Sequence, residues 1–175
     1  KLLPVKFLNS VGLGTAADAA AAILYAASFE DASGNQIVRI SNNSWGSGKS
    51  IRVIEDAVAS SGMLGVAAAG NAGRSKPEYP AGYDLDNVIS VAASDHNDAL
   101  AAYSNYSSKR QQWVDLAAPG DLLLSTLPDG WYGMRSGTST ATPVVSGVAA
   151  MVLSQHPGWS VGDLRHRILS TVDLL

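Results

Sequence analysis

The sequence contains no cysteine, and charged residues make up only 15% of it. Without cysteine the chain has no disulfide, no thiol nucleophile and no cysteine-ligated metal. Its net charge of −3 and its scattered basic residues give no electrostatic footprint for nucleic acid. No apolar run approaches the roughly 18 residues of a membrane-spanning helix. A compact globular protein is the class that remains, and the 46% hydrophobic content fits it.

The 175 residues fit one domain, 1–175, in which apolar segments alternate between strand-like and helix-like periods. This alternation predicts an α/β sheet with crossover helices. Central strands are expected at 64–69 and 88–93, because both are continuous apolar runs. The remaining strands are expected at 5–8, 37–40, 114–118, 122–125 and 132–135. The chain stops soon after its last expected helix, so we expect the domain to be incomplete at both ends.

Capping-box spacings predict where two helices begin. Thr15 and Asp18 open an alanine-rich helix to about Ala27, and Ser160 and Asp163 open a final helix through Leu169. A third helix follows Ser50, a plausible cap, with its apolar residues on one face. A long helix is expected from about 138 to 155, where His-Pro-Gly ends it.

Two short sequence motifs contain the candidate catalytic residues. Residues 137–143, Gly-Thr-Ser-Thr-Ala-Thr-Pro, place the hydroxyl of Ser139 at a helix start, and Asn71 follows a buried strand within Ala-Ala-Gly-Asn-Ala-Gly. Serine there is most often a helix cap, and asparagine between glycines is most often a turn residue. A nucleophile at a helix start would instead gain from unpaired N–H groups and the helix dipole. An amide beside it would stabilise a developing oxyanion.

Together these motifs resemble those of the subtilisin-like serine proteases. The nucleophile motif of that family is Gly-Thr-Ser-Met-Ala-x-Pro, and its oxyanion asparagine sits in a similar Ala-x-Gly-Asn turn. Thr140 departs from the usual methionine. The resemblance runs over about residues 5–172 and matches the C-terminal two-thirds of the catalytic domain. It implies a doubly wound, mostly parallel sheet flanked by helices. It also implies a serine endopeptidase that forms an acyl-enzyme on Ser139, with Asn71 and the Ser139 N–H as oxyanion donors.

The same resemblance implies two segments that bind a polypeptide substrate. One pairs with the substrate as an added strand, which makes recognition largely independent of side chains. The other lines the primary pocket. The residues are Ser44, Trp45 and Gly46 in the first segment, and Ala68, Ala69 and Gly70 in the second. Glu78 is expected near the pocket base, where it would favour a basic or polar side chain; a solvent-facing position is the alternative.

The base and the orienting acid of a serine protease have no candidate in this chain. In the resembled family they come from Asp-Thr/Ser-Gly and His-Gly-Thr-His motifs, both N-terminal to the matched region, and this sequence contains neither. His96, His156 and His166 lack any such motif context. We therefore expect the chain alone to be inactive and an N-terminal segment to complete the site.

The resemblance further implies an extracellular protein that acts on polypeptides, not on nucleic acid or a membrane, and requires no cofactor. Members of the family often bind calcium, but Asp84, Asp86 and the aspartates of 95–98 show no EF-hand spacing, so no calcium site is assigned.

Two other classes of function stay open. One is a peptide-binding pseudoprotease without turnover, and the other is an unrelated α/β binding domain in which Ser139 only caps a helix.

Overall fold

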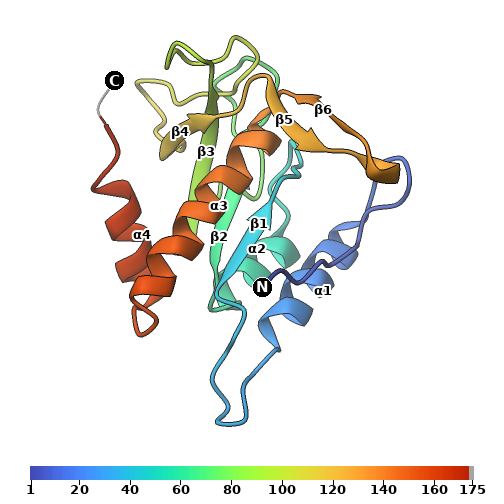
Figure 1. The fold of residues 1–175 in the computed structure, drawn as a ribbon, viewed down its shortest axis with the longest axis vertical. Coiled ribbons are helices and arrows are strands. Elements are labelled where there is room, and N and C mark those ends of the chain that lie inside the picture. The colour runs from blue at the N-terminus through green and yellow to red at the C-terminus, as the bar shows by residue number, and fades with distance from the viewer. Residues whose placement is uncertain (174–175) are drawn as a thin grey trace.

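The structure is a computed structural model that describes residues 1–173. Its central sheet has four parallel strands in the order β1-β2-β3-β4 (Figure 1). These are β1 (Ile40–Asn43), β2 (Leu64–Ala68), β3 (Val88–Ser94) and β4 (Leu116–Pro119). An antiparallel hairpin of β5 (Leu123–Thr126) and β6 (Tyr132–Arg135), with a 3-10 turn at Pro128–Gly130, stands apart from the sheet. The predicted α/β fold with a mostly parallel sheet is confirmed.

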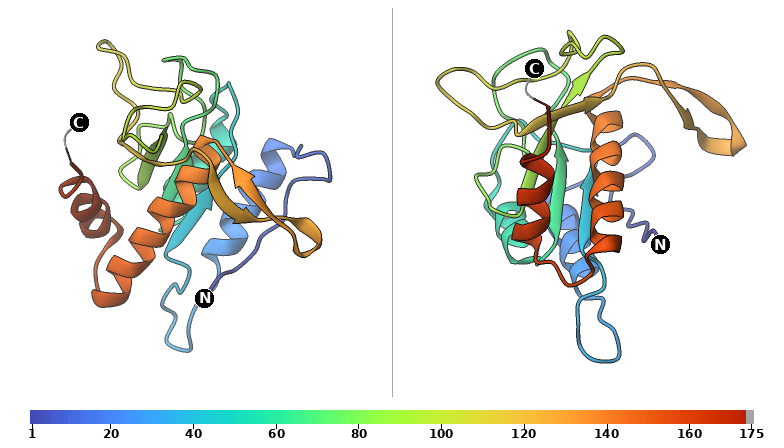
Figure 2. Two further views of the ribbon diagram at one scale, coloured as in Figure 1. Left: turned by 45° about the horizontal axis from the view of Figure 1, so that its top comes forward. Right: turned by 60° about the vertical axis from the view of Figure 1, so that its left-hand side comes forward.

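Four helices cover the sheet: α1 (Ala16–Ala27), α2 (Arg52–Ser60), α3 (Thr138–Gln155) and α4 (Val161–Leu169). Figure 2 shows α3 running along one face of the strands. Successive strand residues point to opposite faces. Val66 accordingly packs into the core cluster of α3 and α4, whereas Ala67 packs into the cluster of α1 and α2. No helix within residues 1–173 is long and apolar enough to cross a bilayer.

Local capping chemistry determines where α1 and α4 begin. Thr15 Oγ1 accepts a hydrogen bond from the Asp18 amide at 3.1 Å, and Ser160 Oγ accepts one from the Asp163 amide at 3.1 Å. Both capping boxes are complete, as predicted. The predicted Ser50 cap is wrong, because α2 begins after Ile51 and has no side-chain cap. The Tyr83 hydroxyl instead bonds the backbone N–H and carbonyl of Ile51, at 3.2 and 3.0 Å.

Two strand predictions are corrected by pairing. Residues 5–8 form no strand, because no segment within residues 1–173 makes ladder hydrogen bonds with them. Phe7 instead packs edge-on against Trp45, with a distance of 5.1 Å between the ring centroids. The strand predicted at 37–40 lies at Ile40–Asn43, where it pairs in register with β2. The other predicted strands are shifted by two residues or fewer. A strand needs a hydrogen-bonded neighbour, which local sequence does not reveal.

The outer edge of β1 borders a large groove. In the sheet order β1 is terminal, so within the described chain its outer side has no strand partner. The groove has a volume of about 1180 Å³ and is lined by residues of the N-terminal segment, α1, β1 and α3. Its lining includes Ser44 and Trp45, so it opens directly beside the candidate site.

Gly120, just after β4, lies where the start of α3 approaches the sheet. A Cβ on this residue would stand 2.7 Å from Ala93 Cβ, 2.9 Å from the Gly137 carbonyl oxygen and 3.0 Å from Ala141 Cβ. Because two of these atoms belong to buried neighbours that have no room to move, we expect Gly120→Ala to destabilise the full-length protein by about 1–3 kcal/mol in urea unfolding. The matched control is Gly158→Ala, whose Cβ would meet nothing within 4 Å. An equal loss in both variants would contradict this packing explanation.

Candidate active site

The predicted site residues converge at the carboxyl end of the parallel sheet, the edge where α/β folds place their ligands. The chain leaves β1 through Ser44 and leaves β2 through Ala69 to Asn71, while α3 begins beside both at Thr138. Hydrogen bonds join these three segments. Ser44 Oγ donates to the Ser139 carbonyl at 2.8 Å, and the Gly70 amide donates to Thr138 Oγ1 at 3.0 Å.

The side chain of Asn71 is oriented by Thr138. Its Oδ1 accepts hydrogen bonds from the Thr138 amide at 2.8 Å and from Thr138 Oγ1 at 3.0 Å. Because the backbone amide only donates, this contact identifies the oxygen end of the Asn71 amide. The nitrogen end, Nδ2, lies beside Gly137: a Cβ built on that glycine would stand 3.5 Å from it. Within residues 1–173, Nδ2 donates to no acceptor, so it is free to bind a ligand oxygen.

The start of α3 presents a second free donor. Gly137 is the N-cap with φ 151° and ψ 157°, a conformation that residues with a Cβ rarely adopt, and α3 has no side-chain cap. The Thr140 and Ala141 amides both donate to the Gly137 carbonyl. The Ser139 amide finds no acceptor in the described chain. Ser139 therefore is not the helix cap, and its N–H stands free at the positive end of the helix.

The Gly120 carbonyl anchors the start of α3 through two hydrogen bonds. The Tyr103 hydroxyl and the Gly137 amide both donate to the Gly120 carbonyl, each at 2.8 Å. Burial raises the pKa of Tyr103, with Asp121 adding to the rise, so the hydroxyl keeps its donor proton at neutral pH. Gly137 is thus fixed by its hydrogen bond to Gly120, and Thr138 is fixed by its hydrogen bonds to Asn71.

Ser139 is exposed, and no basic side chain within residues 1–173 bonds its hydroxyl. The hydroxyl donates to the Ser44 carbonyl oxygen at 3.1 Å, which is too weak a base to take its proton. His156 lies at the far end of α3 and stacks on Trp159, His96 lies in a turn with Asn97, and His166 lies on α4. The three histidines thus stay outside the site, as predicted.

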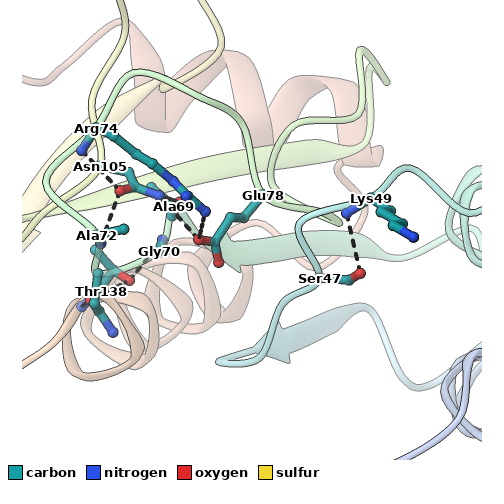
Figure 3. Close-up of polar contacts among 10 residues, drawn as sticks. Ser47, Lys49, Ala69, Gly70, Ala72, Arg74, Glu78, Asn105 and Thr138 are labelled. Carbon is teal, nitrogen blue, oxygen red and sulfur yellow. Dashed lines mark hydrogen bonds and ion pairs between the residues drawn. The ribbon is translucent and has the colours of Figure 1, made fainter.

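Glu78 lies beside both predicted substrate segments: a Cβ built on Gly46 would stand 3.4 Å from its Oε2, and one built on Gly70 would stand 2.8 Å from it (Figure 3). The Ser47 and Tyr79 amides and carbonyls exchange two hydrogen bonds of 2.8 Å, which fix the chain around Glu78 beside residues 44–46. Glu78 Oε1 accepts from Arg74 Nη2 at 3.2 Å. The carboxylate therefore lies close to both segments and is 21% exposed, while its expected place at the base of the primary pocket stays a prediction.

Three residues of this site were missed by sequence reasoning. Thr138 orients Asn71, and Arg74 pairs with Glu78, a pair whose four-residue spacing was visible in the sequence. Asn105 is fully buried; its amide donates to the Ala69 carbonyl at 2.9 Å, and its oxygen accepts from the Ala72 amide at 3.0 Å. No local pattern marks Asn105, because every one of these contacts spans more than thirty residues.

The acidic side chains considered for calcium do not gather. No group of three or more His, Asp or Glu side chains within residues 1–173 is arranged to hold a metal ion. Calcium binding accordingly has no assigned residues in the part of the chain that the structure describes.

Comparison with known proteins agrees with this geometry. The model of the subtilase family, Peptidase_S8, matches residues 1–174. Thermitase of Thermoactinomyces vulgaris is 38% identical over 172 residues, which are 98% of this chain and 57% of thermitase. The thermophilic serine proteinase of Bacillus sp. (strain AK1) is 40% identical over 99% of this chain and 40% of its own length.

Solved structures give the same result. Sphericase superposes with a TM-score of 0.83 at 35% identity, over 93% of this chain and 57% of that structure. The S41 psychrophilic protease also has a TM-score of 0.83, at 34% identity. The chain spans about half the length of the curated relatives that it matches. By fold, by motif and by family model, the chain belongs to the subtilase family.

Proposed function

We propose that the full-length protein is a serine endopeptidase that hydrolyses polypeptides through an acyl-enzyme on Ser139. The observation that carries the proposal is the pair of free donors, Asn71 Nδ2 and the Ser139 N–H, beside an exposed serine hydroxyl. Two preorganised donors at this place suit the negative oxygen of a tetrahedral intermediate. A helix cap or a turn asparagine needs neither of them.

The reaction assigns each group one task. Ser139 Oγ attacks the substrate carbonyl carbon and passes its proton to a base, while the oxyanion accepts hydrogen bonds from Asn71 and the Ser139 amide. The base then gives this proton to the substrate nitrogen as the C–N bond breaks, and the amine leaves. Water then attacks the acyl-enzyme and gives a proton to the base. The ester bond to Ser139 breaks, Oγ takes this proton back, and the acid product leaves. Residues 44–46 pair with the substrate backbone, and residues 68–70 line the primary pocket with Glu78 at its base.

We propose further that the base and its orienting acid come from sequence N-terminal to Lys1. Three observations support this: the chain covers 57% of thermitase, β1 has no strand partner on its outer side within residues 1–173, and the apolar groove beside it opens next to Ser44. A segment that pairs with β1 and fills this groove would bring a base close to Ser139. We likewise propose that the protein is extracellular, because the resemblance to the family implies it.

A peptide-binding protein without turnover is the second candidate. It is favoured by the hydrogen bond from the Ser139 hydroxyl to the Ser44 carbonyl, which leaves the serine unactivated, and by Thr140 in place of the family's methionine.

Covalent labelling of the full-length protein separates the two candidates. A fluorophosphonate reacts with a serine that has a functioning base and oxyanion site, so we expect one label per chain, located on Ser139 by peptide mass spectrometry. Ser154→Ala, on the same helix, should label normally. Peptide binding without any label on Ser139 would establish the second candidate instead.

A further inference from the structure

The Glu78 carboxylate faces both substrate segments with the same oxygen. A Cβ built on Gly70 would stand 2.8 Å from Oε2, and one built on Gly46 would stand 3.4 Å from it. Gly70 has φ +103°, so neither space nor backbone conformation admits a side chain there. Oε2 therefore lies close to both segments, and the proposed function places the substrate side chain between them.

The other carboxylate oxygen is already occupied. Oε1 accepts from Arg74 Nη2 at 3.2 Å and from Asn105 Nδ2 at 3.5 Å (Figure 3). Asn105 is itself anchored, because its Nδ2 also donates to the Ala69 carbonyl and its Oδ1 accepts from the Arg74 amide at 3.2 Å. Oε2 accepts from no group within residues 1–173. One oxygen is thus held by the protein, and the other is available to a ligand.

Arg74 contributes little to stability but much to the local charge. Its side chain is 49% exposed and that of Glu78 is 21% exposed. An ion pair as open as this adds little to folding. The positive guanidinium nevertheless lies against the carboxylate and offsets the negative potential that a substrate cation would meet. Removing Arg74 would leave the charge of Glu78 uncompensated beside the two segments.

From this arrangement we infer that Arg74 and Glu78 together determine specificity in the primary pocket. Glu78 Oε2 selects a side chain that ends in a hydrogen-bond donor, and Arg74 limits how strongly a lysine or arginine is preferred over a neutral side chain of equal length. The inference rests on the proposed function for the location of the pocket. It adds a specificity-determining residue, Arg74, which acts on selectivity through Glu78, and it assigns a separate role to each oxygen of the Glu78 carboxylate.

The test is a comparison of two labelled peptides that differ only by lysine or norleucine on the amino side of the scissile bond. Binding is measured by fluorescence anisotropy in the full-length protein carrying Ser139→Ala, so that no peptide is cut. We expect a small preference for lysine in this background. Arg74→Ala should raise the preference about fivefold, and Glu78→Gln should reduce it to about one, in line with a partly screened charge pair. Arg52→Ala, which breaks an exposed pair with Asp56 on α2, should leave the ratio unchanged.

The outcomes are separable from those of the proposed function. An unchanged ratio in Arg74→Ala, a lysine preference that survives Glu78→Gln, or no binding of either peptide would each overturn the inference. Fluorophosphonate labelling of the same variants with Ser139 retained reports on the protease alone. Labelled protein with an unchanged ratio rejects only the pocket assignment. A shifted ratio in protein that takes no label rejects the protease and keeps the pocket.

Discussion

Replacing Ser139 with alanine should lower kcat for peptide hydrolysis by the full-length protein by about 10⁶-fold, the magnitude found for the serine of subtilisin, a member of the same family. The reason is chemical: without Oγ no acyl-enzyme forms, and only direct attack by water remains. The substitution removes one atom of an exposed residue and, within residues 1–173, one hydrogen bond, which the hydroxyl donates to the Ser44 carbonyl. Kinetics with a chromogenic peptide, followed over hours for the variant, would measure the loss.

Two controls sharpen this result. Ser154→Ala, near the other end of α3, removes a hydroxyl that bonds only the Met151 carbonyl and should leave kcat unchanged. The Ser139→Ala variant should also bind extended peptides about as tightly as the parent, because residues 44–46 are intact. Full activity of Ser139→Ala would place the nucleophile elsewhere and reject the proposed mechanism.

Replacing Asn71 with alanine should lower kcat by about 10²–10³-fold with little change in KM, a magnitude that again comes from subtilisin. Nδ2 meets a negative oxygen only in the tetrahedral intermediate, so its loss raises the barrier without weakening ground-state binding. Steady-state kinetics on one peptide, with kcat and KM resolved separately, make the measurement. Loss of binding with unchanged kcat would contradict the oxyanion role.

Asn71 also accepts two hydrogen bonds from Thr138, so its replacement by alanine has a structural consequence as well. Asn71→Asp separates the two effects, because it keeps the acceptor for Thr138 and removes the donor. We expect it to lose at least as much activity as Asn71→Ala while melting closer to the parent. Thr138→Ser keeps the hydroxyl and should stay active. Thr138→Val should lose activity, because Asn71 loses one of its two orienting hydrogen bonds and the Gly70 amide loses its acceptor.

Elements governed by neighbouring residues were predicted from sequence almost without error. The capping boxes at Thr15 and Ser160 set the starts of α1 and α4, because each box closes within a single turn. The strands β2 and β3 follow from uninterrupted apolar runs that only a sheet covered on both faces accepts.

Elements governed by distant partners were predicted less well. Residues 5–8 have the composition of a strand but no ladder within residues 1–173, and β1 begins three residues later than expected because its register is set by β2. The start of α2 is held by Tyr83, more than thirty residues away, instead of by Ser50. In each case the deciding hydrogen bond joins segments whose proximity no local pattern records.

The same division runs through the candidate site. The sequence by itself determined the family resemblance, the placement of Ser139 at a helix start and that of Asn71 at a strand end, because these depend on motifs of six or seven residues. Only the tertiary structure decided which end of the Asn71 amide is free, which oxygen of Glu78 is held by Arg74 and Asn105, and that these two residues belong to the site. Hydrogen-bond direction and charge compensation depend on atoms brought together across the fold, and chain order does not encode their orientation.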